Sequence, residues 1–370
     1  MPESELAHRV GAVRPAEKNL PAVTARRKHT GAGEETQLRS LHKAAAVCGV
    51  VAALLVTGCS GTGGSSSGTP ELVLAVETNE GDPLADMLLA FADEVEAELG
   101  GAVTLKVQTG GAIGDEEAVL QGLRGGAVDI AAVSGSVANL DPMFNIMEMP
   151  FLFTDRDTVS EFLDGDFGAE LSDSLVDSIG ARVLAFGENG FRHVTNSERP
   201  ITTSADLAGL RIRVPGSPAR VSLFEALGAA PTQIDLGEAY LALDQGVLDG
   251  QENPLKVVDA FSLYEKQRYL SLTSHIYSPV YLTVNERSWQ RLSPEIRQGL
   301  EKAATAASAT SRQLGADADT TLIDRFEAAG VEVNDADIDQ LRRQVAGVRD
   351  EIAGDIPGDF ADRVLAEYGR

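Results

Sequence analysis

The stretch LDQGVLDGQENP, from Leu243 to Pro254, concentrates groups that could hold a ligand or brace a turn. Two glycines precede three polar side chains, Gln251, Glu252 and Asn253, and a proline follows them. An ordinary junction between a helix and a turn needs one glycine and a capping residue. The additional amide and carboxylate groups therefore indicate a further role, either in stabilising the local structure or in binding a ligand.

Residues suited to catalysis or metal binding are scarce in the rest of the sequence. The two cysteines are Cys48 and Cys59, and only two of the five histidines, His193 and His275, follow them. A zinc site would need carboxylates beside two histidines that are far apart in the sequence. Outside the Gly/Ser-rich run at 60–70, the sequence contains no G-x-S-x-G nucleophile elbow. We therefore expect no catalytic residue, no metal site and no cofactor.

The glycine-rich segment QTGGAIGDEE, from Gln108 to Glu117, follows a predicted strand and precedes a predicted helix. A dinucleotide-binding loop has the same context, but its spacing is G-x-G-x-x-G, whereas the spacing here is G-G-x-x-G. Three acids, Asp115, Glu116 and Glu117, also stand where a phosphate would bind. A tight turn between a strand and a helix explains the segment better.

The composition is that of a soluble globular protein with an acidic surface. Hydrophobic residues make up 43% of the chain, charged residues 24%, and the formal net charge is −25. Such a surface repels phosphate backbones, so we expect no nucleic-acid partner. A chain of 370 residues can bury a large core and is long enough for two lobes.

An export signal is predicted near the beginning of the chain. Arg39 and Lys43 give a basic flank to the apolar run from Ala44 to Val56, which is too short to span a bilayer comfortably. We assign residues 39–58 to a lipoprotein signal peptide. An ordinary signal peptide or a short buried helix are the alternatives.

The end of this run, VTGC, resembles a bacterial lipobox, in which the cysteine receives a lipid and becomes the mature N-terminus. We therefore expect Cys59 to be lipidated and the protein to be anchored on the extracytoplasmic side of the cell membrane. The run SGTGGSSSGTP that follows is typical of a flexible tether, which we place at residues 59–70. Residues 1–38 are polar and aperiodic, and we interpret them as an unstructured arm or as a start codon assigned too far upstream.

Beyond residue 70, short apolar runs alternate with helical patterns, which is typical of α/β lobes built from parallel crossovers. The predicted strands are 72–77, 103–109, 128–134, 182–187, 211–214, 232–236 and 280–284. The predicted helices are 83–99, 116–124 and 218–227, one that carries positions 236, 240, 243 and 247 on one face, and a long one that begins at 293–295. The triplet Ser293-Pro294-Glu295 supplies a cap, a first-turn proline and an acid at the positive helix end. We expect Gly246 and Gly250 in left-handed turns and a helix that begins at Pro254.

Residues 209–255 read GLRIRVPGSPARVSLFEALGAAPTQIDLGEAYLALDQGVLDGQENPL. The motifs R-V-P, G-A-x-P-T, G-E-x-Y and D-G-Q-E-N-P resemble, in this order, those of the solute-binding subunit of TRAP transporters, the DctP-like family. Asp244 departs from the family pattern, which more usually has glutamine or another polar residue there. Residues 111–131 and the PFLF motif at 150–153 resemble first-lobe segments of the family, and residues 188–201 resemble its crossover into the second lobe.

The resemblance implies an α/β, two-lobed, periplasmic-binding-protein-like fold with a ligand cleft between the lobes and a long C-terminal helix region. We place the first lobe at 71–189 plus 279–318 and the second at 190–278 plus 319–370. The implied function is that of an extracytoplasmic receptor that binds a small carboxylate-bearing solute by cleft closure and delivers it to TRAP permease subunits in the membrane.

The family also implies which residues bind the solute. The arginine of R-V-P, here Arg213, holds the ligand carboxylate in most members, and a guanidinium suits a carboxylate better than an ammonium does. An arginine on an exposed strand is the alternative. Asn253 would offer an amide to the same carboxylate, cap the following helix, or do both. Arg192 matches a second arginine that some members use, while Gln251 and Glu252 are expected to brace the hinge.

The other wall of the cleft should decide the class of solute. Glu77 falls where the first strand of the family ends at the cleft, and its carboxylate is expected to face Arg192 or Arg213; a solvated acid at a strand end is the alternative. An acid there would repel a dicarboxylate and accept hydrogen bonds from an ammonium group or from sugar hydroxyls. Ser134 is expected on the first-lobe side, and Leu236 stands where an aromatic side chain is common. Sugar acids, hydroxy or keto acids, dicarboxylates and ectoine-like zwitterions all stay open, as does a role for a cation.

Two other functions stay open on the sequence alone. A binding protein of the same fold could serve a sensor instead of a permease, and a permease gene beside this one would separate the two. An enzyme could also use such a fold, but the scarcity of histidine and the lack of a base and nucleophile pair argue against it.

Overall fold

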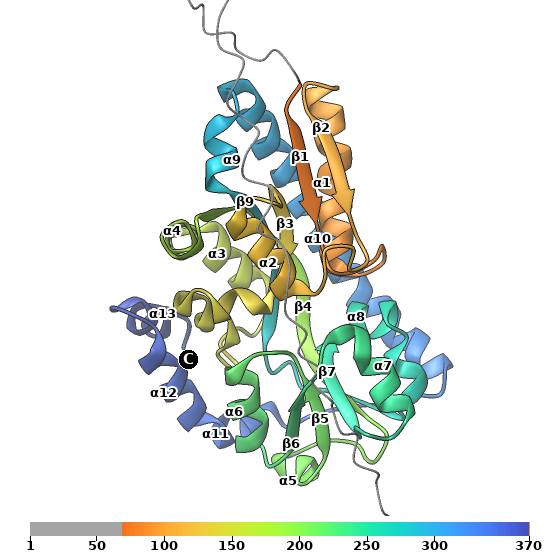
Figure 1. The fold of residues 1–370 in the computed structure, drawn as a ribbon. Coiled ribbons are helices and arrows are strands. Elements are labelled where there is room, and N and C mark those ends of the chain that lie inside the picture. Colours follow the sequence, from red (N-terminus) through yellow and green to blue (C-terminus); the bar gives the residue numbers. More distant parts are fainter. Residues whose placement is uncertain (1–68, 370) are drawn as a thin grey trace, which may run out of the picture. The chain divides into compact units, whose positions relative to one another are not determined.

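The computed structural model describes residues 69–369, which form an α/β architecture of helices packed around a mixed sheet (Figure 1). The strands of this part of the chain are hydrogen-bonded in the order β2-β1-β3-β9-β4-β7-β5-β6, and β8 joins β4 to β10. The strands are β1 (Glu71–Ala75), β2 (Thr104–Gln108), β3 (Ile130–Val133), β4 (Ala181–Asn196), β5 (Arg211–Val214), β6 (Ala230–Gln233), β7 (Gly250–Pro254), β8 (Tyr269–Leu272), β9 (Tyr277–Asn285) and β10 (Glu332–Asp335).

The helices are α1 (Pro83–Leu99), α2 (Glu116–Gly125), α3 (Arg156–Asp164), α4 (Asp166–Ile179), α5 (Ser204–Leu207), α6 (Pro218–Ala226), α7 (Leu236–Asp244), α8 (Leu255–Ala260), α9 (Glu286–Arg291), α10 (Pro294–Ala328), α11 (Ile338–Gln344), α12 (Ala346–Asp355) and α13 (Phe360–Tyr368). Three short 3-10 helices are η1 (Gly135–Asn139), η2 (Pro142–Glu148) and η3 (Leu263–Lys266). None of the described helices combines the length and the apolar character that a membrane crossing requires.

The strand pairing divides the sheet into two lobes. In one lobe β1 pairs in parallel with β2 and β3, and in the other β5 pairs in parallel with β6 and β7. The long strand β4 belongs to both, because its first part pairs with β9 and its last part with β7 and β8, all antiparallel. Two crossover-built lobes joined by the continuous strand β4 confirm the predicted two-lobed α/β fold.

Local capping signals explain where the longest helices begin. In α1 the Asp82 side chain accepts a hydrogen bond from the amide of Leu84, and Pro83 occupies the first turn. In α10 Ser293 caps in the same way by accepting from the amide of Ile296. Both helix starts agree with the sequence prediction.

The crossing between the lobes is closely packed. A β-bulge interrupts the pairing of β4 with β9 between Glu188 and Gly190, and Gly190 has φ +123°, which favours glycine. A Cβ atom at Gly315 of α10 would lie 2.6 Å from Cδ of Glu188. Glycine at this position therefore lets the long helix α10 lie directly against β4.

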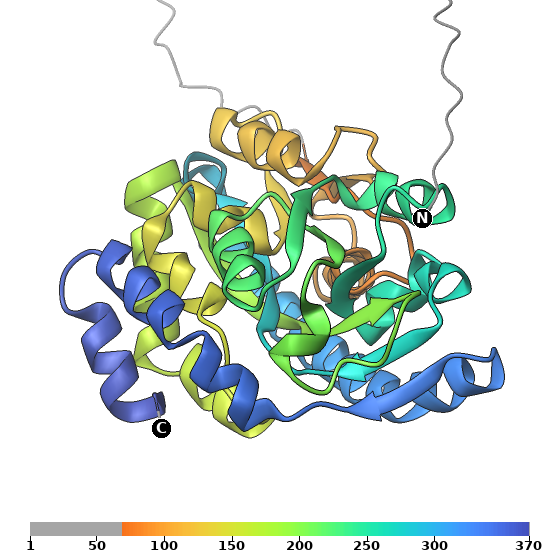
Figure 2. The same cartoon turned by 90° about the horizontal axis from the view of Figure 1, so that it is seen from below.

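After α10 the chain returns along the outside of the molecule (Figure 2). Strand β10 pairs with β8, and α12 packs against α6 and η2. The last helix, α13, ends on α3 and α4, where Tyr368 makes edge contacts with Phe153 and Phe162. The lobe limits given above stay a prediction; under them, α13 falls in the second-lobe range although it contacts first-lobe helices.

The structure corrects several predicted boundaries. Strand β6 ends at Gln233, so Leu236 begins α7 instead of ending a strand. The segment Gly250–Pro254 is a buried strand and not a turn, and Gly250 does not have a positive φ, whereas Gly246 does. The arm, the signal peptide, Cys59 and most of the tether lie outside the described residues.

Candidate functional site

A cavity of about 180 Å³ lies beyond the carboxyl ends of the parallel strands of both lobes. One side is formed by the segments that follow β1, β2 and β3, and the other side by the segments that follow β5 and β6 together with β7. Ligands bind at such strand ends in open α/β sheets, because the loops there are free to vary while the sheet holds them in place. This cavity is therefore our candidate site.

Among the described residues, Arg213 is the buried cation of the cavity that forms no ion pair with a carboxylate. It lies on β5, is 3% exposed and lines the cavity. Its Nε donates to the carbonyl oxygen of Ile234 at 2.7 Å, which fixes the plane of the guanidinium. Its two Nη nitrogens have no hydrogen-bond partner among the residues that the structure describes. Burial lowers the pKa of Arg213 to about 10, so the group still carries its charge at neutral pH.

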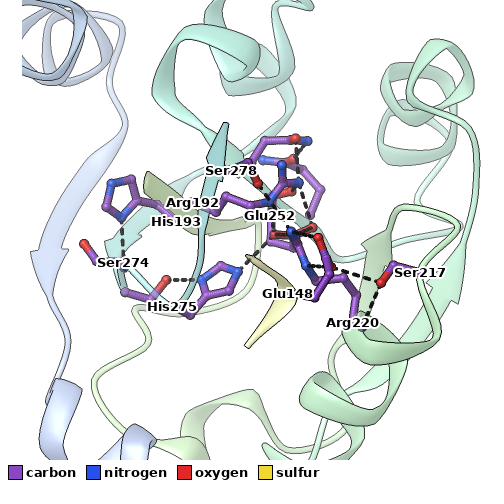
Figure 3. A network of polar contacts seen from close by, with 12 residues as sticks. Glu148, Arg192, His193, Ser217, Arg220, Glu252, Ser274, His275 and Ser278 are labelled. Atoms are coloured by element: carbon purple, nitrogen blue, oxygen red, sulfur yellow. Dashed lines mark hydrogen bonds and ion pairs between the residues drawn. The ribbon is translucent and has the colours of Figure 1, made fainter. Parts of the chain in front are cut away.

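Arg192 also lines the cavity, but most of its donors are already used (Figure 3). Its Nε donates to Oε2 of Glu252 at 2.6 Å, and its Nη2 donates to Oε1 of Glu252 at 2.8 Å and to Oδ1 of Asn253 at 2.7 Å. Burial would raise the pKa of Glu252, but Arg192 and Arg220 outweigh it and hold that pKa well below its ordinary value. Within the described part of the chain, Arg192 keeps only Nη1 for a ligand.

Glu252 is the centre of a buried polar network, and its expected role in bracing the hinge stays a prediction. Besides Arg192, Nη1 of Arg220 donates to its Oε2 at 3.0 Å. Nε2 of His275 lies 3.0 Å from the same oxygen. Since Glu252 is fully buried, its charge is kept by these partners and not by water.

Arg220 and Glu148 form a second part of this network that the sequence analysis missed. Nε and Nη2 of Arg220 donate to Oε2 and Oε1 of Glu148 at 2.7 and 3.0 Å, and the Ser217 hydroxyl donates to Oε2 at 3.0 Å. Arg220 lies on α6 and is only 1% exposed. Leu223 and Phe224 of the same helix are fully buried. The signal in the sequence that could have identified Arg220 was an arginine beside the apolar face of a short predicted helix.

Asn253 lies where its amide can serve both the network and the cavity. Its Oδ1 accepts from Arg192, and its Nδ2 donates to Oε1 of Gln251 at 2.6 Å. The expected capping role is wrong, because Pro254 is the N-cap of α8 and no side chain caps that helix. One amide hydrogen of Asn253 is left for a ligand in the cavity that it lines.

The opposite wall of the cavity carries two neighbouring carboxyl groups. Oε2 of Glu77 accepts from the backbone amide of Glu116 at 2.9 Å, so the first turn of α2 binds the Glu77 side chain where a phosphate would sit in a nucleotide loop. Burial, with the charge of Glu116 second, raises the pKa of Glu77 to about 8. Glu77 and Arg213 line the same cavity, and the charge of Arg213 acts to lower the pKa of Glu77, but no ion pair joins Glu77 to Arg192 or Arg213 among the described residues.

Glu116 and Ser134 complete this wall. Glu116 accepts from the Ser134 amide and, at 3.0 Å, from the Ser136 hydroxyl, and burial raises its pKa. The Ser134 hydroxyl donates to the carbonyl of Pro279 at 2.7 Å. Ser134 was predicted as a site residue, but Glu116 was considered only as an acid that disfavours a bound phosphate. Leu236, half-buried at the start of α7, lines the cavity from the other lobe.

Comparison with known sequences points to one family. Residues 74–355 match the family model described as bacterial extracellular solute-binding protein, family 7. The chain is 36% identical over 314 residues to the 2,3-diketo-L-gulonate-binding periplasmic protein YiaO of Escherichia coli (strain K12), which covers 83% of this chain and 94% of that protein.

Solved structures with the same architecture carry small acids. A TRAP periplasmic solute-binding protein from Sulfitobacter sp. NAS-14.1 with bound β-D-galacturonate superposes with a TM-score of 0.77 at 26% identity, covering 81% of this chain and 100% of that one. Another TRAP periplasmic solute-binding protein, from Polaromonas sp. JS666 and bound to D-erythronate, superposes with a TM-score of 0.76 at 29% identity. The match covers 80% of this chain and 98% of that one.

Proposed function

This chain belongs to the family of bacterial extracellular solute-binding proteins, family 7, and from that premise we propose that its cavity binds a polyhydroxy monocarboxylate of the sugar-acid type. The receptor takes up this solute outside the cytoplasm and delivers it to the membrane permease subunits with which TRAP solute-binding proteins work. Arg213 is the main anchor for the carboxylate, and Asn253 and the remaining Nη1 of Arg192 assist it.

The observation that carries the proposal is that the two Nη nitrogens of the buried Arg213 have no hydrogen-bond partner among the described residues. A buried charge without a counter-ion is costly, whereas a carboxylate can accept two parallel hydrogen bonds from the two free Nη nitrogens. Because the protein is acidic overall, with a net charge of −25, long-range attraction does not favour an anion. The affinity for an anionic solute must therefore arise locally at this arginine.

The wall around Glu77, Glu116 and Ser134 supports a solute that also carries hydroxyl groups. With its pKa raised to about 8, Glu77 is mostly protonated at neutral pH and can both donate and accept hydrogen bonds. Sugar hydroxyls have the same double capacity. The relatives named above bind 2,3-diketo-L-gulonate, β-D-galacturonate and D-erythronate, which combine a carboxylate with further oxygens.

A thermal-shift panel tests this proposal. D-galacturonate, D-glucuronate and D-erythronate represent the proposed class, succinate represents dicarboxylates, and ectoine represents zwitterions. At 100 times the dissociation constant a bound solute stabilises the folded state by about 2.7 kcal/mol, which gives a clear rise in melting temperature. A rise with succinate or ectoine alone would exclude the proposed solute class.

We also propose that Cys59 is lipidated and anchors the receptor to the membrane, with residues 39–58 removed as a signal peptide. The proposal is supported by the VTGC motif and by the Gly/Ser-rich segment that follows it. Cys59→Ser should release the protein from the membrane fraction, whereas the matched variant Cys48→Ser, inside the apolar run, should leave it anchored. Retention of Cys59→Ser in membranes argues against lipidation.

A further inference from the structure

An ion pair joins the two lobes beside the cavity. Lys256 lies near the start of α8, and Asp86 lies in the first turn of α1 (Figure 1). Nζ of Lys256 is 2.5 Å from Oδ2 of Asp86, and the two side chains are only 18% and 17% exposed. Leu84 and Val257, which are close to them in the sequence, line the cavity. The pair therefore spans the cleft immediately next to the candidate site.

The two partners belong to separately packed parts of the molecule. Helix α1 packs in a hydrophobic cluster with residues of β3, β9 and the first half of α10, such as Val280 and Leu300. Helix α8 packs in another cluster with residues of β8 and the second half of α10, such as Leu270 and Leu322. A relative movement of the lobes therefore changes the distance between Lys256 and Asp86.

The carboxylate of Asp86 is held in place on its own side of the cleft. Its Oδ1 accepts from the backbone amide of Gly81 at 2.7 Å, which leaves Oδ2 directed at Lys256. A second contact between the lobes, from Nδ2 of Asn139 to the carbonyl of Gly216 at 2.7 Å, lies at another edge of the cavity. Of these two contacts, the one made by Lys256 depends on charge and can be reversed by substitution, whereas the ion pair of Arg220 with Glu148, which also joins the two lobe ranges, is buried in the network around Glu252.

We propose that Lys256 and Asp86 form an electrostatic latch that favours the closed arrangement of the lobes. Lys256 is a positioning residue in this scheme, because it acts through the lobes and not through a contact with the solute. The proposal rests on the proposed function in one respect, namely that the closed cavity is where the solute is retained. Partly shielded ion pairs typically shift an equilibrium about two- to fivefold, so the latch biases closure without locking it.

Spin-label distance measurements on the protein without solute test the latch. Labels on Ala97→Cys in α1 and Glu238→Cys in α7 report on the distance between lobes, in a full-length chain whose Cys48 and Cys59 are replaced by serine. Lys256→Met and Asp86→Asn should each shift the distances towards larger values, by about two- to fivefold in the ratio of closed to open forms. The double reversal Lys256→Asp with Asp86→Lys should restore the parent distribution.

A matched control replaces another lysine that forms an ion pair but does not join the two lobes. Lys266 pairs with Asp244 at 2.8 Å, and both residues lie on the same lobe. Lys266→Met should leave the distances unchanged. If Lys256 acted only by attracting the anionic solute, neither single variant would change the distances measured without solute.

Identical distance distributions in the parent, Lys256→Met and Asp86→Asn would overturn the latch. A shift in one single variant and not in the other would overturn it as well, because a pair loses its attraction whichever partner is removed. Circular dichroism shows whether either single variant folds poorly. If one of them does, the other still tests the latch. Since no solute is present, failure of the latch is distinguishable from failure of the proposed solute class.

Discussion

At the scale of single residues, the site is defined by which buried charges already have partners. Glu252 is shared by Arg192 and Arg220, and Glu148 holds Arg220 a second time. Arg213 is as deeply buried but has no carboxylate within ion-pair distance in the described structure. Because a buried charge without an ion-pair partner is costly, we propose that Arg213 holds the solute carboxylate, that Arg192 contributes only its remaining Nη1, and that Arg220 has a structural role.

Replacing Arg213 should therefore weaken binding without unfolding the protein. Arg213→Lys keeps the charge but loses the two parallel hydrogen bonds, so we expect the affinity for D-galacturonate to fall by about tenfold or more. Titration calorimetry measures this change. The matched control is Arg211→Lys, two residues earlier on the same strand, where the arginine is exposed and pairs with Asp249 at the surface. Equal affinities in both variants and the parent would remove Arg213 from the site.

Glu77 makes the stability depend on pH in an unusual direction. Its pKa is raised from 4.5 to about 8 in the folded state. Between these values the folded protein keeps a proton that the unfolded chain has lost, so the contribution of Glu77 to stability falls as pH rises through this window. A carboxylate paired with a cation would show the opposite slope.

Glu77→Gln should remove this loss of stability. We expect the melting temperature of the variant, relative to the parent, to rise by about 3 °C or more between pH 5 and pH 8. Scanning calorimetry at the two pH values checks the expectation. Glu71→Gln, at the exposed start of β1, the strand that precedes Glu77, serves as the control. Melting curves of Glu77→Gln that follow the parent at every pH contradict the buried, protonated state.

At the scale of elements, the sequence predicted best what local chemistry determines. The limits of α1 and the start of α10 were correct, because a capping side chain and a first-turn proline act within a few residues. The motifs also predicted that Arg213, Arg192 and Asn253 lie together, and all three line one cavity. Which of them are already paired is decided by distant residues such as Glu252, and spacing along the chain does not contain that information.

The strand β7 shows why the prediction failed where the site begins. Strands are recognised by apolar alternation, but Gln251, Glu252 and Asn253 are polar and fully or almost fully buried. They are tolerated because they bond one another and their neighbours; Nε2 of Gln251, for example, donates to Thr195 at 2.8 Å. Strand β4 extended past its predicted end for the same reason, since Thr195 and Asn196 are buried polar residues.

The close packing of α10 against β4 gives a test at this scale. In Gly315→Ala the added Cβ would lie 2.6 Å from Cδ of Glu188, so helix and strand must separate or the side chain must move. We expect a loss of about 1–3 kcal/mol in the free energy of unfolding, measured by urea titration. Gly347→Ala in α12 is the control, because nothing lies within 4 Å of its added Cβ. Equal stability of Gly315→Ala and the parent would show that this contact is loose.

At the scale of the whole molecule, the lobes are joined by the long strand β4, which runs through both of them. Strand β4 pairs on one side of its bulge with β9 and on the other side with β7 and β8. Bending at a few residues near Gly190 can therefore open and close the cavity while each lobe keeps its own core. The contacts from Lys256 and Asn139 across the cleft are among those that such bending would strain.

We expect a bound sugar acid to shift the lobes towards closure. Small-angle X-ray scattering at saturating D-galacturonate should give a smaller radius of gyration than the protein alone, because a solute held from both walls binds the closed form more tightly. Arg213→Lys at the same concentration should contract less. Binding proven by calorimetry with no contraction of the parent would argue against closure.

The central claim is that Arg213 holds the carboxylate of a sugar acid, and a crystal structure of the protein with D-galacturonate tests it most directly. We expect the carboxylate to accept hydrogen bonds from both Nη nitrogens of Arg213 at about 3 Å, with hydroxyl groups of the sugar facing Glu77 and Ser134. A carboxylate bound elsewhere in the cavity, with Arg213 left as it is here, contradicts the claim.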